Sequence, residues 1–301
     1  MKKEVIAKMS KLIIGLSNST ALARAIANKL KVPFSTLKVS HFPDGEIYLR
    51  FTMPLKDAKV ILVQTMHPRP SEALLELVFA AKTARELGAK KIIGVIPYLA
   101  YMRQDTSFKK GECVSARQMA WLLSNTLDHL ITIDPHLHRV RNLGEIFTIP
   151  TKTLSVNNLL ADFIGTRFRK EIIIGPDVES YQWASMIAKR LRMHAFVLRK
   201  KRYAARKVKI KIKESIPIKG KPVIIIDDII SSGTTMIETI KEVKRLGAKS
   251  ILCIAVHGIL AEGALEKLKR AGAEVITTNT ITNPVGKIDV SGLIAEELEK
   301  I

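Results

Sequence analysis

The sequence predicts an α/β protein made of two homologous domains, each a mainly parallel sheet flanked by helices. Short aliphatic runs alternate with amphipathic stretches along the chain, a pattern typical of strands buried on both faces of a parallel sheet. The length of 301 residues exceeds that of an average domain, which favours two domains. An internal repeat supports a duplication.

The predicted strands are runs rich in Val, Ile and Leu, bounded by polar residues, Gly or Pro. Helical periodicity lies between them, as in residues 73–87 and 236–246. Repeated strand–helix–strand units imply parallel pairing within each domain. The runs are Lys11–Leu16, Val60–Gln64, Ile92–Ile96, Leu130–Asp134, Glu171–Ile174, Val223–Asp228 and Ile251–Val256.

The internal repeat joins a helix end to the strand that follows it. Residues 86–93 read Glu-Leu-Gly-Ala-Lys-Lys-Ile-Ile, and residues 245–252 read Arg-Leu-Gly-Ala-Lys-Ser-Ile-Leu. Upstream, the strand at residues 60–65 corresponds to that at residues 223–228, with one small length difference between the matched segments. Two matches in the same order favour common ancestry over chance.

The two copies differ in chemistry, because the second has Asp227-Asp228 where the first has Gln64-Thr65. The catalytic groups are therefore expected mainly in the second half. We predict domains of residues 1–148 and 149–301, with the last residues able to pack back on the N-terminal domain.

The composition predicts a soluble cytoplasmic protein. No window approaches about 18 uninterrupted apolar residues, so no membrane span is expected. Residues 1–10 are too charged for a secretory signal. The cysteines, Cys113 and Cys253, give no disulfide framework and suit a reducing compartment.

The net charge of +21 permits nucleic acid, anionic lipid or phosphorylated small molecules as partners. A lysine-rich solvated surface is the plainer interpretation. Residues 199–213 concentrate nine Lys or Arg with no acid, yet aromatic residues do not interleave with them as stacking platforms would. We therefore favour a phosphate-rich small substrate and expect neither nucleic acid nor membrane as a partner.

The strongest local signal is residues 223–235, where an aliphatic strand ends in Asp227 and Asp228 and a Ser/Gly/Thr loop opens a helix. A helix N-terminus carries partial positive charge and suits a phosphate. The acids can accept hydrogen bonds from sugar hydroxyls or hold water on Mg²⁺. An ordinary capped helix is the structural alternative. The residues of this loop that we expect to bind the phosphate are Ser231, Ser232, Gly233, Thr234 and Thr235.

This loop resembles the ribose-5-phosphate loop shared by phosphoribosyltransferases and ribose-phosphate pyrophosphokinases. It lacks the Gly-Lys-Ser/Thr of a Walker A loop. Residues 42–46 (Phe-Pro-Asp-Gly-Glu), 98–105 (Tyr-Leu-Ala-Tyr-Met-Arg-Gln-Asp) and 134–136 (Asp-Pro-His) resemble the pyrophosphokinases, and simple phosphoribosyltransferases lack them. The resemblance extends from about residue 10 to the C-terminus, so residues 1–8 are expected to be an extension, with Met9 as an alternative start.

The resemblance implies two phosphoribosyltransferase-like domains and a diphosphoryl transfer from Mg²⁺·ATP to the C1 hydroxyl of ribose 5-phosphate. It implies Mg²⁺ contacts from His136 and Asp177, and a catalytic pair, Lys200 and Arg202, on a flexible loop. It further implies a homo-oligomer in which residues 42–46 reach the ATP site of a neighbouring subunit. The ATP-binding residues that it implies are Phe42, Asp44, Glu46, Arg103, Gln104, Asp105 and His136.

Taken alone, several of these residues admit a structural interpretation. The Pro-Asp-Gly turn after Phe42 is explained by turn chemistry, with the aromatic ring half-buried. Arg103 can be a surface arginine, and His136 can make a structural hydrogen bond. The alternation in residues 207–213 predicts one strand of a long hairpin with a basic face. A solvated cationic edge strand is the alternative there.

One segment departs from the family pattern. After Asp177 the family continues with small residues and glycine, whereas this chain has Val178-Glu179-Ser180. The departure leaves a non-catalytic regulatory homologue as an alternative to the enzyme. A phosphoribosyltransferase is a further alternative, disfavoured by the segments that resemble an ATP site.

Overall fold

The computed structural model describes residues 11–137, 139–168, 171–204, 207–211 and 216–301, with residues 199–204 and 207–211 described as backbone only. The chain forms two compact units. The N-terminal unit comprises the chain up to Leu154 together with Thr280–Thr282 and Ser291–Ile301. The C-terminal unit comprises Ser155–Asn279 and Asn283–Val290. The predicted extension at residues 1–8 and Met9 lies outside the described residues.

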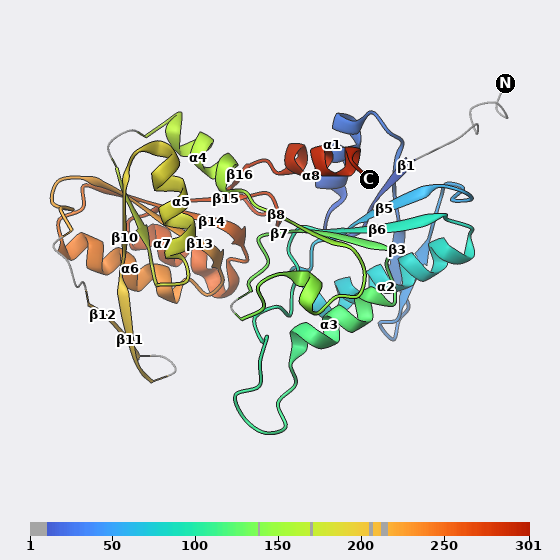
Figure 1. Cartoon of the computed structure of the whole chain (residues 1–301), viewed down its shortest axis with the longest axis horizontal. Helices are drawn as coiled ribbons and strands as arrows, with labels where there is room; N and C mark the ends of the chain where they lie inside the picture. The colour runs from blue at the N-terminus through green and yellow to red at the C-terminus, as the bar shows by residue number, and fades with distance from the viewer. Residues whose placement is uncertain (1–10, 138, 169–170, 205–206, 212–215) are drawn as a thin grey trace. The chain divides into compact units, whose positions relative to one another are not determined.

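The N-terminal unit is a six-stranded parallel sheet in the order β2-β1-β5-β6-β7-β8 (Figure 1). A separate antiparallel hairpin, β3–β4, follows β2 in the chain. Helices α1 and α8 contact each other on one face of the sheet, and α2 contacts β5 and β6 on the other. The elements are β1 (Lys11–Gly15), α1 (Thr20–Leu30), β2 (Phe34–Thr36), β3 (Lys38–His41), β4 (Ile47–Arg50), β5 (Lys59–Val63), α2 (Pro70–Glu86), β6 (Lys91–Ile96), α3 (Ser115–Ser124), β7 (His129–Ile133), η1 (Leu143–Glu145), β8 (Thr151–Leu154) and α8 (Ser291–Glu299).

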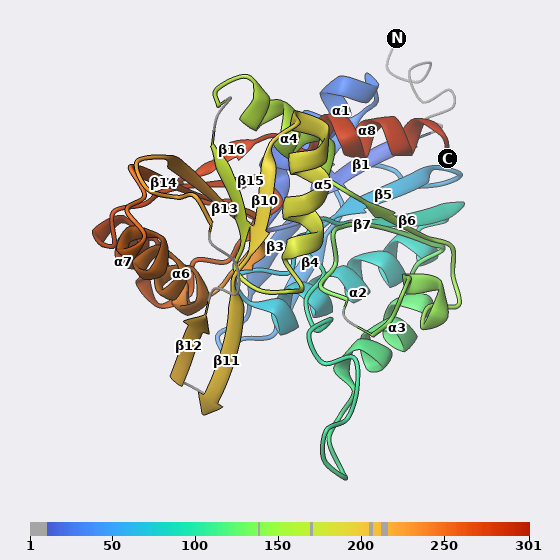
Figure 2. The ribbon, with the colours of Figure 1, turned by 60° about the vertical axis from the view of Figure 1, so that its left-hand side comes forward.

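The C-terminal unit is a second six-stranded parallel sheet, in the order β10-β9-β13-β14-β15-β16. Helices α4 and α5 pack together on one face, and α6 and α7 pack together on the other (Figure 2). The elements are α4 (Asn157–Gly165), β9 (Ile172–Gly175), α5 (Tyr181–Leu191), β10 (His194–Val197), β11 (Arg199–Ala204), β12 (Lys207–Lys211), β13 (Pro222–Ile230), α6 (Thr234–Arg245), β14 (Ser250–Gly258), η2 (Ala261–Gly263), α7 (Ala264–Arg270), β15 (Glu274–Thr278) and β16 (Gly286–Ile288).

The two sheets have the same strand order, which confirms the predicted duplication and fold class. The repeated upstream strands are β5 and β13, and the repeated helix ends lead into β6 and β14. Gly88 and Gly247 occupy equivalent positions after α2 and α6 with φ of +85° and +83°, where a side chain would be strained. The repeated Leu-Gly-Ala therefore marks one helix-ending geometry used twice.

Each unit has its own apolar core, because its strands are buried on both faces. Leu12, Val60 and Leu62 are fully buried in the N-terminal unit, and Ile174 and Ile225 are fully buried in the C-terminal unit. Burying one such side chain contributes about 1.5–3 kcal/mol relative to leaving it in water. This burial explains why the strands appear as continuous aliphatic runs in the sequence.

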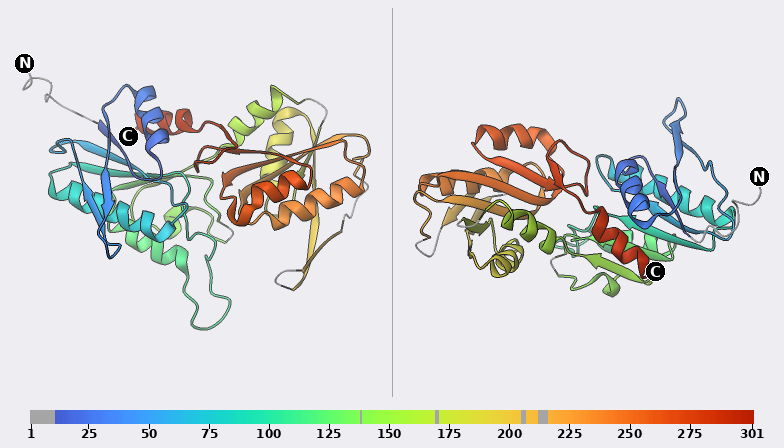
Figure 3. Two further views of the ribbon diagram at one scale, coloured as in Figure 1. Left: turned by 180° about the vertical axis from the view of Figure 1, so that it is seen from behind. Right: turned by 90° about the horizontal axis from the view of Figure 1, so that it is seen from above.

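Helix α8 closes the chain on the N-terminal unit, beside α1 in both views of Figure 3. Lys11 Nζ donates to the carbonyl oxygen of Leu298 at 2.6 Å, and Lys59 Nζ donates to Ile301 O at 2.8 Å. Cations are favourable at a helix C-terminus, where carbonyl groups lack partners within the helix. The two lysines thus hold the end of α8 against β1 and β5.

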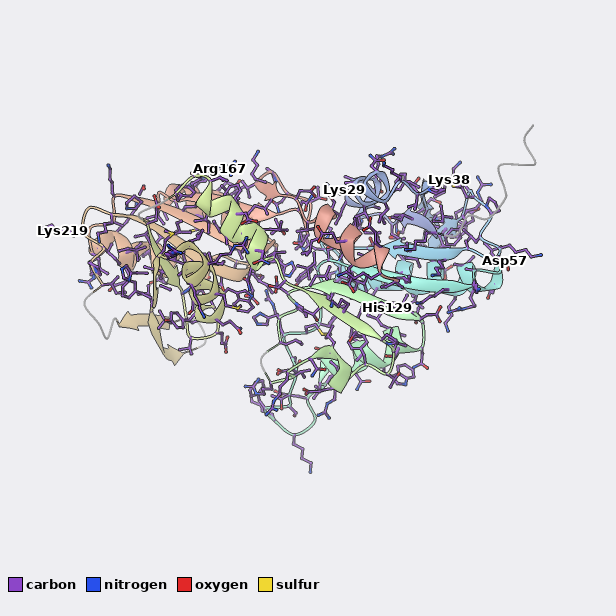
Figure 4. All side chains as sticks on the ribbon, turned by 45° about the horizontal axis from the view of Figure 1, so that its top comes forward. Lys29, Lys38, Asp57, His129, Arg167 and Lys219 are labelled. Carbon is purple, nitrogen blue, oxygen red and sulfur yellow. The ribbon has the colours of Figure 1, made fainter. Side chains whose placement is uncertain are left out.

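Exposed lysines on both units carry part of the positive charge of the chain. Lys29, Lys38 and Lys219, labelled in Figure 4, are exposed. Their positions on α1, on β3 and before β13 spread positive charge over both units. Among the described residues, every helix is too short or too polar to cross a membrane.

Candidate active site

The predicted phosphate loop lies at the carboxyl end of β13. The strand continues past Asp227 and Asp228 to Ile230, two residues beyond the predicted end, and α6 begins at Thr234. Gly233 has φ of +76°, and a Cβ there would lie 3.2 Å from Cβ of Ala264. Glycine at this position therefore allows the chain to turn closely against α7 and enter α6.

The N-terminus of α6 has donor groups that suit an anion. The helix has no side-chain cap, and its first-turn N–H groups carry partial positive charge. Ser232 Oγ and Thr234 Oγ1 lie 3.1 Å apart where the loop enters the helix. Hydroxyl and backbone donors at one helix N-terminus suit a phosphate group.

Three acidic side chains lie close together at the carboxyl ends of β9 and β13. Desolvation raises the pKa of Asp227 well above its ordinary value, and the charges of Asp228 and Asp177 raise it further. The backbone N–H of Asp228 donates to Asp227 Oδ1 at 3.1 Å, which favours the ionised form of Asp227 but does not outweigh the other effects. Burial, with a smaller effect of the Asp227 charge, raises the pKa of the Cys253 thiol on β14 to about 12.

Asp177 is held in a closed turn by Ser180. The Ser180 backbone N–H donates to Asp177 Oδ1 at 3.0 Å, and the Ser180 hydroxyl donates to the same oxygen at 2.9 Å. The Asp177 backbone N–H donates in turn to Ser180 Oγ at 3.0 Å. Ser180 is buried, whereas Val178 and Glu179 face solvent. The departure from the family pattern therefore forms an ordered turn that fixes the Asp177 carboxylate.

The Phe-Pro-Asp-Gly-Glu segment forms the tip of the β3–β4 hairpin. The Phe42 N–H donates to Glu46 O at 2.9 Å, and the Glu46 N–H donates to Asp44 Oδ1 at 3.1 Å. Phe42 is 52% exposed and meets Tyr48 edge-on, with ring centroids 6.1 Å apart. Phe42 is thus half-buried, as a structural turn would also have it, and the tip still presents part of an aromatic ring and two carboxylates to solvent.

The loop between β6 and α3 carries Arg103, Gln104 and Asp105. Arg103 is exposed and Gln104 is partly exposed, while the Asp105 side chain is fully buried. The Ala116 N–H donates to Gln104 O at 3.2 Å, which ties this loop to α3. A planar guanidinium and an amide thus face outward, where they can meet a ligand.

His136 is partly exposed and lies just beyond β7, which ends at Ile133, one residue before the predicted end at Asp134. The preceding Asp134 has φ of +33°, and its N–H donates to Leu154 O at 2.9 Å. On the other side of His136, Arg139 contacts the buried Asp105. The structure therefore joins the loop after β6 to the segment that carries His136. His138, within that segment, lies outside the described residues.

The basic run forms the predicted hairpin. Strands β11 and β12 pair antiparallel, with Lys200 opposite Ile210 and Arg202 opposite Val208. Figure 2 shows this hairpin beside β10 and α6. The backbone positions of Lys200 and Arg202 are described, while their side chains, the turn at residues 205–206 and residues 212–213 of the predicted strand lie outside the described part of the chain.

The C-terminal unit thus gathers Asp177, Asp227, Asp228 and the loop at residues 231–235, and it also carries Lys200 and Arg202 on β11. The N-terminal unit carries the predicted ATP-binding residues. The sequence interpretation missed the roles of Ser180 and Arg139. The Asp-x-x-Ser spacing of residues 177–180, typical of helix capping, could have revealed Ser180. No local pattern marks Arg139, because its partner is distant in sequence.

The donor set at the strand ends is compatible with Mg²⁺. Carboxylate oxygens are the protein ligands that this ion prefers, and it usually keeps several waters or substrate oxygens. No group of three His, Cys, Asp or Glu side chains in the described part of the chain is arranged to enclose a metal by itself. The site therefore suits an ion held jointly by one or two carboxylates and a phosphorylated substrate.

Comparison with known proteins gives consistent matches over nearly the whole chain. Residues 11–126 match the N-terminal domain of ribose phosphate pyrophosphokinase, and residues 142–293 match the phosphoribosyl transferase domain. The chain is 33% identical to the ribose-phosphate pyrophosphokinase of Methanopyrus kandleri over 293 residues, covering 96% of this chain and 99% of that protein. It is 36% identical to the ribose-phosphate pyrophosphokinase of Pyrococcus furiosus over 262 residues, covering 87% of this chain and 92% of that protein. The crystal structure of phosphoribosylpyrophosphate synthetase from Mycobacterium smegmatis matches with a TM-score of 0.84 and 25% sequence identity. The match covers 96% of this chain and 98% of that chain.

Proposed function

The chain belongs to the ribose-phosphate pyrophosphokinase family, and we propose that it makes 5-phosphoribosyl 1-diphosphate and AMP from ATP and ribose 5-phosphate, for nucleotide biosynthesis. The C1 hydroxyl oxygen of the sugar forms a bond to the β-phosphorus of ATP. The bond from that phosphorus to the oxygen shared with the α-phosphate breaks, AMP leaves, and the hydroxyl proton passes to solvent. The observation that carries the proposal is the acidic strand end of β13 leading into the uncapped N-terminus of α6.

The 5-phosphate of the sugar binds the loop from Ser231 to Thr235. Its oxygens accept from the first-turn N–H groups of α6 and from the hydroxyls of Ser231, Ser232, Thr234 and Thr235. Gly233 supports this contact, since its positive φ brings the backbone into the helix without a side chain in the way.

Asp227 and Asp228 hold the sugar hydroxyls. They end the same strand that leads into the phosphate loop, so a sugar bound through its 5-phosphate lies beside them. The raised pKa of Asp227 means that burial and the neighbouring acids disfavour its charge. Hydroxyl donors from the sugar relieve that desolvation, because a hydrogen bond to an ionised carboxylate stabilises it.

ATP binds through residues of the N-terminal unit. Arg103 offers its planar fork to phosphate, and Gln104 and His136 lie on segments joined by the Asp105–Arg139 contact. Phe42 can stack on adenine, while Asp44 and Glu46 accept from its amino group or the ribose. Asp105, whose side chain is fully buried, is not among the residues that we place against ATP.

The exposed hairpin tip suits a site shared between subunits. Phe42 presents about half of its surface to solvent, where a monomer would gain from covering it. We propose a homo-oligomer in which the tip of β3–β4 completes the ATP site of a second copy. With a two-fold axis, the hairpin tip of each subunit would contact the ATP site of the other.

Lys200 and Arg202 on β11 stabilise the transferring group. Diphosphoryl transfer spreads negative charge over many oxygens, so catalysis depends chiefly on positioning and electrostatic stabilisation. A two-stranded hairpin at the edge of the unit can close over the substrates and open again to release products.

Asp177 fits a role in holding Mg²⁺, because Ser180 fixes its carboxylate and Asp227 and Asp228 lie near. His136 suits a contact through water, since imidazole is a poorer partner than oxygen for this ion. When bound, Mg²⁺ supplies charge neutralisation at the phosphate oxygens of ATP.

The products test the proposal. After incubation with Mg²⁺, ATP and ribose 5-phosphate, AMP and 5-phosphoribosyl 1-diphosphate should form in equal amounts. Formation of ADP would contradict the diphosphoryl transfer, and the absence of any reaction would favour the non-catalytic alternative.

A further inference from the structure

Asp105 differs from its neighbours in the same loop. Its side chain is 0% exposed, whereas Arg103 faces solvent and Gln104 is partly exposed. Burying a carboxylate is costly unless the charge is paired and hydrogen-bonded. A group that touches ATP directly would need access to the ligand, so the burial of Asp105 points to an internal task.

Asp105 forms two hydrogen bonds with Arg139. The Arg139 backbone N–H donates to Asp105 Oδ2 at 2.7 Å, and its guanidinium donates to Asp105 Oδ1 at 3.0 Å. The same guanidinium lies 5.1 Å from the centroid of the Phe108 ring, in cation–π geometry. Arg139 is therefore held at two points by the loop that joins β6 to α3.

These contacts anchor the C-terminal end of the segment that carries His136. At its other side, the Asp134 N–H bonds to Leu154 O on β8 at 2.9 Å. Between the two anchors, the Leu137 N–H donates to Pro135 O at 2.7 Å, which makes a tight turn around His136. His136 thus lies in a short segment with its two ends fixed to different elements.

We infer that Asp105 is a positioning residue, which holds the His136 segment in place through Arg139 and does not itself contact ATP. The inference rests on the proposed function, because it concerns the task of His136 there. It differs from the direct ATP contact that the family resemblance implies for Asp105.

A double-mutant cycle separates positioning from direct contact. The variants are Asp105→Asn, His136→Ala and their combination, with kcat and the KM values for ATP and ribose 5-phosphate measured for each. Asp162→Asn is the matched control, since it removes a charge from an exposed Asp–Arg pair at 2.7 Å. Hydrogen exchange of residues 134–142, followed by mass spectrometry, reports on the segment without using activity.

Asp105→Asn should lower kcat about 10- to 100-fold, the scale expected when a reacting geometry is displaced slightly. The KM for ribose 5-phosphate should stay unchanged, and the segment at residues 134–142 should exchange faster. In the His136→Ala background, Asp105→Asn should cause little further loss, because both changes remove the same contribution. The Asp162→Asn control should match the wild type in every measurement.

Independent losses that multiply in the double variant would overturn the inference, as would an Asp105→Asn variant with full activity. If Asp105→Asn does not fold, the cycle is run with Arg139→Ala, whose side chain is 54% exposed. The fall in kcat caused by Arg139→Ala should likewise disappear in the His136→Ala background. Full activity of His136→Ala would instead contradict the role of His136 in the proposed function. The positioning role of Asp105 would then also be wrong.

Discussion

Ser180 Oγ donates to Asp177 Oδ1 at 2.9 Å and accepts from the Asp177 backbone N–H at 3.0 Å, so the two residues hold each other at the end of β9. Ser180 is buried, and its backbone N–H adds a further bond to the same carboxylate oxygen. The Val178-Glu179-Ser180 departure therefore replaces the family's small residues with a turn that orders the acid.

Ser180→Ala should destabilise the protein by about 1–3 kcal/mol, because it leaves the Asp177 N–H in a partly buried turn without its acceptor. Urea unfolding of the ligand-free protein measures the change. Thr166→Ala is the control, since it removes an exposed hydroxyl that bonds to Phe163 O at 3.0 Å. Equal stability of the two variants would contradict a structural role for Ser180.

Lys200→Ala should lower kcat by about 10²-fold or more with a modest change in KM, the scale for losing one electrostatic stabiliser of the transition state. Lys219→Ala removes the same charge from an exposed site elsewhere in the C-terminal unit and should leave kcat unchanged. An unchanged kcat for Lys200→Ala would remove this residue from the mechanism.

Asp227→Asn and Asp228→Asn should weaken ribose 5-phosphate binding by about tenfold or more while the fold persists, because each loses a charge-assisted hydrogen bond of about 1.5–3 kcal/mol. Isothermal titration calorimetry measures binding, and circular dichroism checks the fold. If a variant unfolds and shows no separate binding defect, that aspartate has a structural role and the proposed contact with ribose 5-phosphate is wrong.

Asp227 should also make the stability of the protein depend on pH. Because folding raises its pKa, the folded state keeps a proton that the unfolded chain releases, and this stabilisation is lost as pH rises from about 3.9 through the folded pKa. Asp227→Asn should therefore stabilise the ligand-free protein at pH 7 and have a smaller effect below pH 4. Urea unfolding at the two pH values checks this, and a larger gain at the lower pH would contradict the raised pKa.

Glu46→Ala and Lys200→Ala test the shared ATP site by complementation. Each variant alone should be weak, but after unfolding and refolding together, mixed dimers should contain one site with both residues intact. Activity should then exceed the average of the two variants. No recovery in proven mixed dimers would confine each site to one subunit and leave the reaction assignment untouched.

The fold was predictable because its strands are continuous aliphatic runs, as in Val223–Asp228, whose burial on both faces leaves no polar alternation. Strand β15 was not predicted because it lacks a long aliphatic run. Its apolar residues are Val275 and Ile276, and the others are Glu274, Thr277 and Thr278. Among the site residues, the loop after Asp228 was visible in sequence because strand, loop and helix are contiguous.

Contacts between distant residues were not predictable in this way. The Asp105–Arg139 pair spans two loops, and nothing local distinguishes Asp105 from the exposed Arg103 beside it. Burial decides between a ligand contact and an internal anchor, and burial of a charged residue follows from tertiary packing rather than from local pattern.

The most direct test of the account follows the phosphorus atoms of ATP. With ATP labelled separately at the α-, β- and γ-phosphorus, the protein, Mg²⁺ and ribose 5-phosphate should yield the β and γ labels together in 5-phosphoribosyl 1-diphosphate. The α label should stay in AMP. Retention of the β label in a nucleotide, with the γ label alone reaching the sugar, would contradict diphosphoryl transfer.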